Sequence, residues 1–419
     1  MENSDITIVK LSKNRNFVLL SSARFVSLMG DRIHVMALVW YILNKLGTGA
    51  AIGTIMIMAT LPSVILGPFT GAIADRFDRR KIMLLMDTVR AIAAVTLGIF
   101  VLAGMAYLPI IFAVTIILSI CNALYMPTSA ALFPNLVRDD QLFRANSIAS
   151  FLASFATCIG PAISGLIIAK FGVEGAFIIN GASFIISAIC EYKMRISEKL
   201  SDHPLKVKDF LKRIAEGFSF VIHKPAILAM LLFGMSINFF FFPCHDVILP
   251  IIIKKILNMN AYQFGIIMSV FPLGMLISTL LLQFLPQPEK KHKFMLWSMF
   301  SQALGLILLA LPITPFFFSK INEHYFYTIY IVIAFARGLA FGFSNVPMAV
   351  VNQRIVPNEF RGRVYALQST CYQGLIPIAY GVAGFAIDIV PAYAVVIFAG
   401  ICMGIVCLAM FKVKGIREI

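Results

Sequence analysis

Ionisable side chains interrupt the apolar segments of this sequence at a few positions, and these are the first candidates for chemistry. Asp31 lies near the middle of the first apolar segment, with Arg24 seven residues before it and His34 three residues after it on the same helical face. A charged side chain at the centre of a bilayer costs at least about 2.5–3.5 kcal/mol on insertion scales, so it needs a partner or a function. Asp31 is therefore either a carboxylate that binds a proton or a cation, or the buried partner of an arginine. The candidate partners are Arg24, Arg32 and Arg90.

A second group of polar side chains lies in the apolar segment 226–253. Asn238 is near its middle, and His245 and Asp246 follow closer to the predicted outer side. A histidine beside an aspartate can bind and release protons near neutral pH, which makes this pair a candidate for proton coupling. The alternative is a polar pair that faces a water-filled vestibule at the outer rim.

Further candidates lie in other apolar segments. Arg337 is near the centre of its segment and is predicted to face a cavity and a carboxylate, because an unpaired arginine is hard to bury there. The other residues predicted to line the same cavity are Arg24, Arg32, His34, Asn122, Asn238 and Phe242. Asp87 and Arg90 are three residues apart, a spacing that favours a pair within one helix.

The elements that carry these residues are membrane-spanning helices. The chain has 419 residues, of which 60% are hydrophobic, and its mean hydropathy is +0.89. Soluble domains are about 45–50% apolar, and about 20 apolar residues are needed to cross a bilayer. The sequence predicts an all-α membrane protein with twelve spans. The predicted spans are 17–43, 50–72, 82–103, 108–132, 144–169, 174–194, 226–253, 262–284, 294–314, 325–348, 362–388 and 391–411.

The distribution of positive charges predicts how the chain is oriented across the membrane. If the connecting segments alternate between two sides, 26 of the 35 Lys and Arg residues fall on the side of both termini and 5 fall on the other; the remaining 4 lie inside spans. Because short cytoplasmic loops are rich in Lys and Arg, both termini are predicted to be cytoplasmic. The net charge of +15 is therefore interpreted as topology rather than as a nucleic-acid surface.

The two halves of the sequence resemble each other weakly. Val137 aligns with Val356, and Gly165 with Gly384, at one offset of 219 residues. A parallel repeat predicts two six-helix halves with a cavity between them near the membrane midplane. The expected organisation is an N-terminal half (1–194), a cytoplasmic central loop with an amphipathic helix (195–225) and a C-terminal half (226–419).

A dense charged stretch, "GAIADRFDRR", lies between the second and third spans. It resembles the loop signature G-x-x-x-D-[RK]-x-G-[RK]-[RK] of the major facilitator superfamily, with Asp78 where that family usually has glycine. The matching residues are Gly71, Asp75, Arg76, Arg79 and Arg80. The fifth span carries "GPAISG", which is similar to an element associated with antiporters of that superfamily. Its matching residues are Gly160, Pro161 and Gly165.

The resemblance covers essentially the whole chain and is strongest to the macrolide-efflux-type branch of drug–proton antiporters. It implies that Asp75 caps the eleventh span, that the arginines pair with nearby carboxylates, and that the charged stretch latches one conformation; the alternative is a stretch that only fixes topology. The implied function is proton-coupled export of amphipathic drug-like molecules by alternating access, with Asp31, His245 and Asp246 in proton coupling. Alternatives are export of a siderophore or another metabolite, a lysophospholipid flippase, and a non-transporting receptor on a transporter fold.

The sequence lacks the motifs of the common enzymes. It has no P-loop GxxxxGK[ST], no HExxH, no GxSxG and no clustered metal ligands, and its seven cysteines all lie in apolar segments. We therefore expect no catalytic residue, no cofactor and no metal site. The expected partners are a small amphipathic molecule, protons and the bilayer, for a monomer in the plasma or inner membrane.

Overall fold

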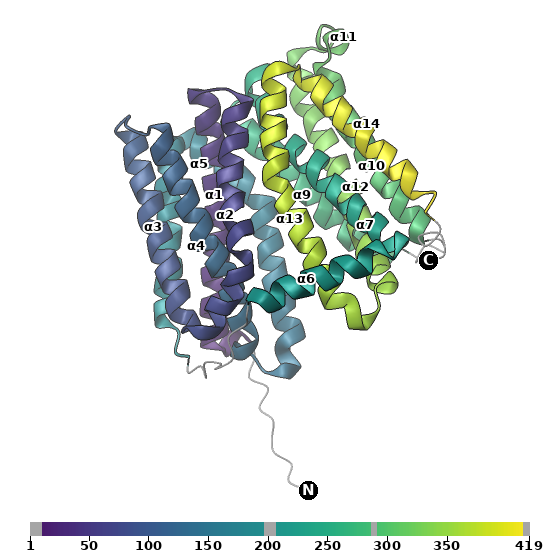
Figure 1. Ribbon diagram of the computed structural model, residues 1–419. Helices are drawn as coiled ribbons and strands as arrows, with labels where there is room; N and C mark the ends of the chain where they lie inside the picture. Colours follow the sequence, from purple (N-terminus) through teal and green to yellow (C-terminus); the bar gives the residue numbers. More distant parts are fainter. Residues whose placement is uncertain (1–10, 197–206, 286–290, 414–419) are drawn as a thin grey trace.

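The chain folds as a bundle of long α-helices in the computed structural model (Figure 1). The structure describes residues 11–196, 207–285 and 291–413; within them, the side chains of 68, 71, 72, 75, 207–214, 291 and 323 are outside the description. The described residues contain no β-strand and include eleven helical segments that are long and apolar enough to cross a membrane. The predicted all-α membrane fold is confirmed.

The helices follow the predicted spans closely. The first group is α1 (Arg15–Lys45), α2 (Gly49–Arg76), α3 (Arg79–Leu102), α4 (Leu108–Leu132) and α5 (Leu142–Lys193), followed by the shorter α6 (Val207–Ile222). The second group is α7 (Pro225–Ser236), α8 (Leu249–Ile251), α9 (Ala261–Phe284), α10 (Lys291–Ala310), α11 (Pro315–Phe318), α12 (Glu323–Ile355), α13 (Asn358–Ile389) and α14 (Ala392–Met410). Figure 1 shows α1 to α5 gathered on one side, α9 to α14 on the other, and α6 across one end.

Helix α5 contains two membrane crossings. Its 52 residues would extend about 78 Å as one straight helix, against about 30 Å of hydrocarbon. Gly172 interrupts it with φ 72° and ψ 178°, a conformation that glycine adopts readily. Gly160 lies against Arg32 and Ser183 lies against Gly30, so both arms flank the same level of α1 and the chain reverses between them. The described residues therefore make twelve crossings, the number predicted.

The seventh crossing is less regular than the sequence predicts. After α7 the chain forms π-helical turns, with α8 between the last two of them. These turns are Ile237–Phe241, Cys244–Ile248 and Ile252–Ile256. Pro243 and Pro250 lie within this stretch, and each lacks the N–H that a regular α-helical ladder needs. Because π-helical turns widen a helix locally, they change which side chains face the neighbouring helices.

The two groups of helices meet along two seams, α2 with α13 and α5 with α9. A Cβ added to Gly165 would lie 2.5 Å from the carbonyl oxygen of Ala261, and a Cβ added to Gly384 would lie 2.6 Å from that of Gly49. Small residues of this kind let membrane helices approach closely. The pair of glycines that the 219-residue offset aligns thus occupies equivalent places on the two seams.

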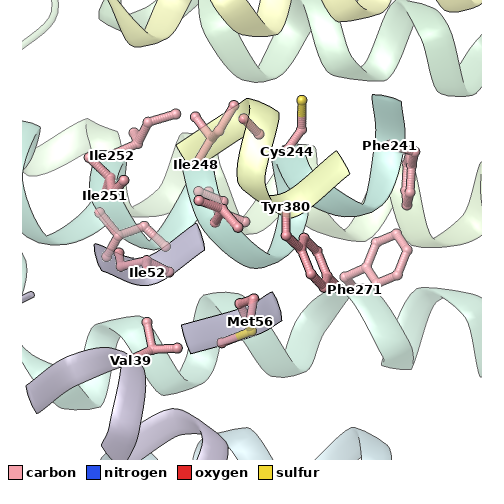
Figure 2. Close-up of a cluster of buried hydrophobic side chains, with 14 of the residues drawn as sticks. Val39, Ile52, Met56, Phe241, Cys244, Ile248, Ile251, Ile252, Phe271 and Tyr380 are labelled. Carbon is pink, nitrogen blue, oxygen red and sulfur yellow. The ribbon is translucent and has the colours of Figure 1, made fainter. Parts of the chain in front are cut away.

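A large apolar core joins the helix groups near these seams. Figure 2 shows its side chains converging from α1, α2, the segment 237–256, α9 and α13. The labelled members are Val39, Ile52, Met56, Phe241, Cys244, Ile248, Ile251, Ile252, Phe271 and Tyr380. All of them are buried, so this core is closed to solvent in the conformation described.

Candidate functional site

A cavity of about 340 Å³ opens between α1, α2 and α4. Its polar lining consists of Asp31, Arg32, His34, Thr115, Ser119 and Asn122. Its apolar lining consists of Leu28, Val35, Leu38, Met56, Ala59, Leu118 and Met126. Met56 also belongs to the apolar core, so that core bounds the cavity. Four of the residues predicted for the site, on α1 and α4, are brought together here.

Asp31 faces this cavity with 37% of its side chain exposed, and its partner is Arg90. One Asp31 carboxylate oxygen lies 3.7 Å from a guanidinium nitrogen of Arg90, which is only 1% exposed. The guanidinium lies between the rings of Tyr125 and Phe184, each 4.4 Å from its carbon, and also pairs with Asp87. Arg90 therefore connects a solvated carboxylate with a buried one.

The other α1 candidates occupy different surroundings. Arg32 is exposed and donates a hydrogen bond of 3.2 Å to Thr157 on α5. His34 is buried with its ring 5.1 Å from that of Phe177, and neither ring nitrogen has a hydrogen-bond partner among the described residues. Arg24 lines a small neighbouring pocket together with Asp31, Arg90 and Asn122.

The candidates on the seventh crossing do not line the 340 Å³ cavity. Asp246 accepts a hydrogen bond of 2.5 Å from the Tyr380 hydroxyl on α13. The ring of His245 instead lies 4.7 Å from that of Phe271, so neighbours in sequence contact different helices. The side chain of Asn238 donates to the Gly234 carbonyl of its own helix at 2.8 Å. Sequence reasoning missed Tyr380, because nothing in its spacing connects it with Asp246.

Arg337 and Phe242 belong to an aromatic cluster beside this site. The Arg337 guanidinium lies 4.8 Å from the ring centre of Phe241, and Arg337 is 2% exposed. Its Nε and one terminal nitrogen have no hydrogen-bond partner among the described residues. The ring of Phe242 lies 6.2 Å from that of Phe341 on α12. The faces of the Phe241 and Phe271 rings stabilise the positive charge of Arg337 in part. The sequence predicts a carboxylate for this role.

The arginines of the charged stretch bind main-chain carbonyls. Arg79 donates to the carbonyls of Ala74 and Ala131, at 3.2 and 3.4 Å. Arg80 donates to the Glu191 carbonyl at 3.0 Å and to that of Tyr192. Carbonyls at helix C-termini carry partial negative charge, so the arginines tie the ends of helices together. The family resemblance implies carboxylate partners for these arginines as well, and those pairs stay a prediction.

Asp78 and the rest of the charged stretch connect α2 to α3. The Asp78 side chain caps α3 by accepting from the Lys81 amide at 3.1 Å, and its φ of −54° needs no glycine. Arg76 is the last residue of α2. Gly71 and Asp75 lie within α2, but the capping of the eleventh span by Asp75 falls outside the described side chains.

The fifth-span element sits between α1 and α9. Gly160 lies against Arg32 on one side, whereas the Pro161 carbonyl and Gly165 lie against Gly265 on the other. A side chain at Gly160 or Gly165 would push α5 away from a neighbour. These residues therefore set how closely α5 approaches the helices on both sides.

A carboxylate latches α2 to α13 at the end remote from the charged stretch. Asp388, near the end of α13, accepts hydrogen bonds from the Gly49 and Ala50 amides at 2.7 and 2.8 Å. These amides open α2 and have no partner within their own helix, so an external carboxylate is favourable there. Sequence reasoning did not single out Asp388, because the contact joins residues more than 330 positions apart.

We expect Asp388→Asn to loosen this end of the seam. The amide retains one acceptor oxygen but loses the charge and one hydrogen bond, a loss of about 1.4 kcal/mol, which is about tenfold in a local opening equilibrium. Amide hydrogen exchange in peptides covering residues 46–60 should become about tenfold faster. Asp140→Asn, at an exposed loop carboxylate, should leave those peptides unchanged, and equal exchange in both variants would contradict the latch.

A helical bundle of this kind, with ionisable groups around a cavity and seams of small residues between two helix groups, has the architecture of a secondary membrane transporter. The sequence model of the Major Facilitator Superfamily matches residues 20–379 and 237–417, so the chain belongs to this family. It is a transporter rather than an enzyme.

Relatives support the same assignment. Macrolide efflux protein A of Streptococcus pyogenes is 27% identical over 399 residues, which cover 93% of this chain and 95% of that protein. The Staphyloferrin A transporter of Staphylococcus aureus is 28% identical over 271 residues, which cover 62% of this chain and 65% of that protein. The crystal structure of the nucleoside transporter NupG agrees in fold with a TM-score of 0.72 at 17% identity, covering 95% of this chain and 100% of that one.

Proposed function

We propose that this chain exports amphipathic, drug-like molecules in exchange for protons, as a monomer in the plasma membrane with both termini in the cytoplasm. In this proposal residues 1–194 and 226–419 are two halves that rock about the substrate, and 195–225 connects them. The similarity to Macrolide efflux protein A over most of both chains supports this substrate class.

The observation that carries the proposal is the sharing of Arg90 between Asp31 and Asp87. Asp31 is exposed to the cavity, so it can exchange a proton with water there. Protonation removes the negative charge of Asp31, so that Asp87 is then the carboxylate that pairs with Arg90. A proton on Asp31 thus weakens the contact between α1 and α3. Because the proton binds more tightly to the conformation in which this contact is absent, it shifts the equilibrium toward that conformation.

The cavity lining suits an amphipathic substrate. Leu28, Met56 and Met126 offer flexible apolar contacts, and methionine adapts to ligands of varied shape. Asp31 and Asn122 provide polar contacts in the same cavity. A cationic substrate would compete with the proton for Asp31, which is the simplest way to couple the two fluxes.

Export of an anionic metabolite, such as a siderophore, is the second candidate. Arg24 and Arg32 lie beside the cavity, and Arg32 is exposed. Guanidinium groups bind carboxylates in bidentate fashion, so they favour an anionic substrate. The similarity to the Staphyloferrin A transporter over 62% of this chain points the same way.

Proteoliposomes with an imposed pH gradient test the proposal. We expect gradient-driven transport of a macrolide or a cationic dye, abolished by a protonophore. Transport of a carboxylate siderophore, with neither of the other two, would favour the second candidate. Transport that persists unchanged with the protonophore would exclude proton coupling.

A further inference from the structure

A second group of ionisable side chains lies behind Arg90, away from the cavity. Asp87 on α3 and Glu191 near the end of α5 are both 0% exposed, and Arg90 is 1% exposed. Arg90 pairs with Asp87 in one direction and with Asp31 in the other. The Glu191 carboxyl interacts electrostatically with Asp87, Arg90 and Tyr125.

Several oxygen atoms in this group have no hydrogen bond of good geometry among the described residues. They are the second carboxyl oxygen of Asp87, both carboxyl oxygens of Glu191, the Tyr125 hydroxyl and the Ser187 hydroxyl. Buried polar atoms in native proteins are almost always paired. Two carboxyl groups that face each other with free oxygens can satisfy one another if one of them is protonated and donates its O–H.

The charges lead to the same conclusion. Asp87 and Glu191 are two buried carboxyl groups that both interact with the guanidinium of Arg90, which Asp31 also engages. Arg80 reaches Glu191 only through the main-chain carbonyl. An ionised carboxylate without a partner costs several kcal/mol in such a site. Two like charges that share a site resolve this cost by holding one proton between them.

We infer that Asp87 and Glu191 form a buried pair that binds one proton, and that Arg90 couples this proton to the one on Asp31. Proton binding at the pair stands without the proposed function, whereas its coupling to transport rests on it. When Asp31 is protonated, the charge of Arg90 is no longer shared with Asp31 and acts on Asp87 and Glu191 alone. This favours the ionised form of the pair, which can then release its own proton. Besides Asp87 and Glu191 themselves, the ionisable groups around the pair are Asp31 on α1, Arg90 on α3, Cys121 and Tyr125 on α4, and Cys190 on α5.

Infrared spectroscopy of the full-length protein in liposomes tests the pair directly. At neutral pH we expect the C=O absorption of a protonated carboxylic acid in the wild-type protein. This band should disappear in Glu191→Gln and in Asp87→Asn, because either change leaves one carboxylate to pair with Arg90. Glu174→Gln, at the far end of α5's second arm, is the matched control and should retain the band.

The outcomes separate the alternatives. A wild-type protein without the band, or a band that survives in Glu191→Gln, overturns the inference. A band that is lost in Glu191→Gln but kept in Asp87→Asn assigns the proton to Glu191 alone and overturns the pair. If the band behaves as expected, gradient-driven export should fall in Glu191→Gln; unchanged export would overturn the coupling. Failure of the wild-type protein to export any drug would leave the band unaffected.

Discussion

Asp31→Asn is expected to abolish gradient-driven export while the protein still folds. The amide has the size of the carboxyl group but cannot bind and release a proton. It also removes the negative charge that engages Arg90 from the cavity side, so Arg90 stays with Asp87 throughout the cycle. Flux driven by a pH gradient in proteoliposomes should fall to the level of empty liposomes.

A second measurement separates lost coupling from a lost binding site. Exchange of a labelled for an unlabelled uncharged substrate across the same liposomes needs neither net proton movement nor the Asp31 charge for binding, so it should continue in Asp31→Asn. Asp139→Asn, at an exposed loop position, should transport as the wild-type protein does. Full gradient-driven export by Asp31→Asn would remove Asp31 from proton coupling.

Much of the fold could be predicted from the sequence because the bilayer imposes it. A crossing needs a long apolar run, and Lys and Arg collect in the connecting segments, so even the boundaries of the crossings can be predicted closely. The boundaries of α4, for example, are those predicted, Leu108–Leu132. The sequence also predicts separate crossings at 144–169 and 174–194, because the alternation of Lys and Arg needs both of them, and Gly172 lies in the gap between the two.

Part of the candidate site could be predicted for a related reason. An ionisable residue within a span is expensive, so composition alone marks Asp31, Arg90 and Arg337. Spacing within a helix then groups Asp31 with Arg24. The structure places both beside one small pocket.

The partners across helices could not be predicted in the same way. Arg90 lies three residues from Asp87 in sequence, so spacing predicts a local pair, which is present; its second contact, with Asp31, depends on how α1 and α3 cross. Tyr380 and Asp246 are 134 residues apart, and π-helical turns set the direction of Asp246. A period of 3.6 residues does not describe such a turn.

Arg90→Leu is expected to destabilise the protein strongly, and by an amount that depends on pH. Removing one member of a buried ion pair costs about 3–5 kcal/mol, because the other charge stays buried without a partner. Here Asp87 is left 0% exposed and facing Glu191. The unfolding transition of the purified protein in detergent should therefore move to much lower temperature at neutral pH. A protonated Asp87 needs no counter-charge, so the loss should shrink as the pH falls.

Two comparisons make this prediction specific to the buried charge. Arg138→Leu breaks an exposed pair with Asp140, whose nitrogen and oxygen lie 3.2 Å apart, and should cost about 0–1 kcal/mol. The double change Arg90→Leu with Asp87→Leu replaces both buried charges by apolar groups and should recover most of the lost stability. If the double variant were as unstable as Arg90→Leu alone, the loss would come from packing against Tyr125 and Phe184 rather than from an unpaired carboxylate. Recovery would instead show that the carboxylates around Arg90 stabilise its charge within the membrane. Protonation of one of these carboxylates can then shift the Arg90 side chain toward another.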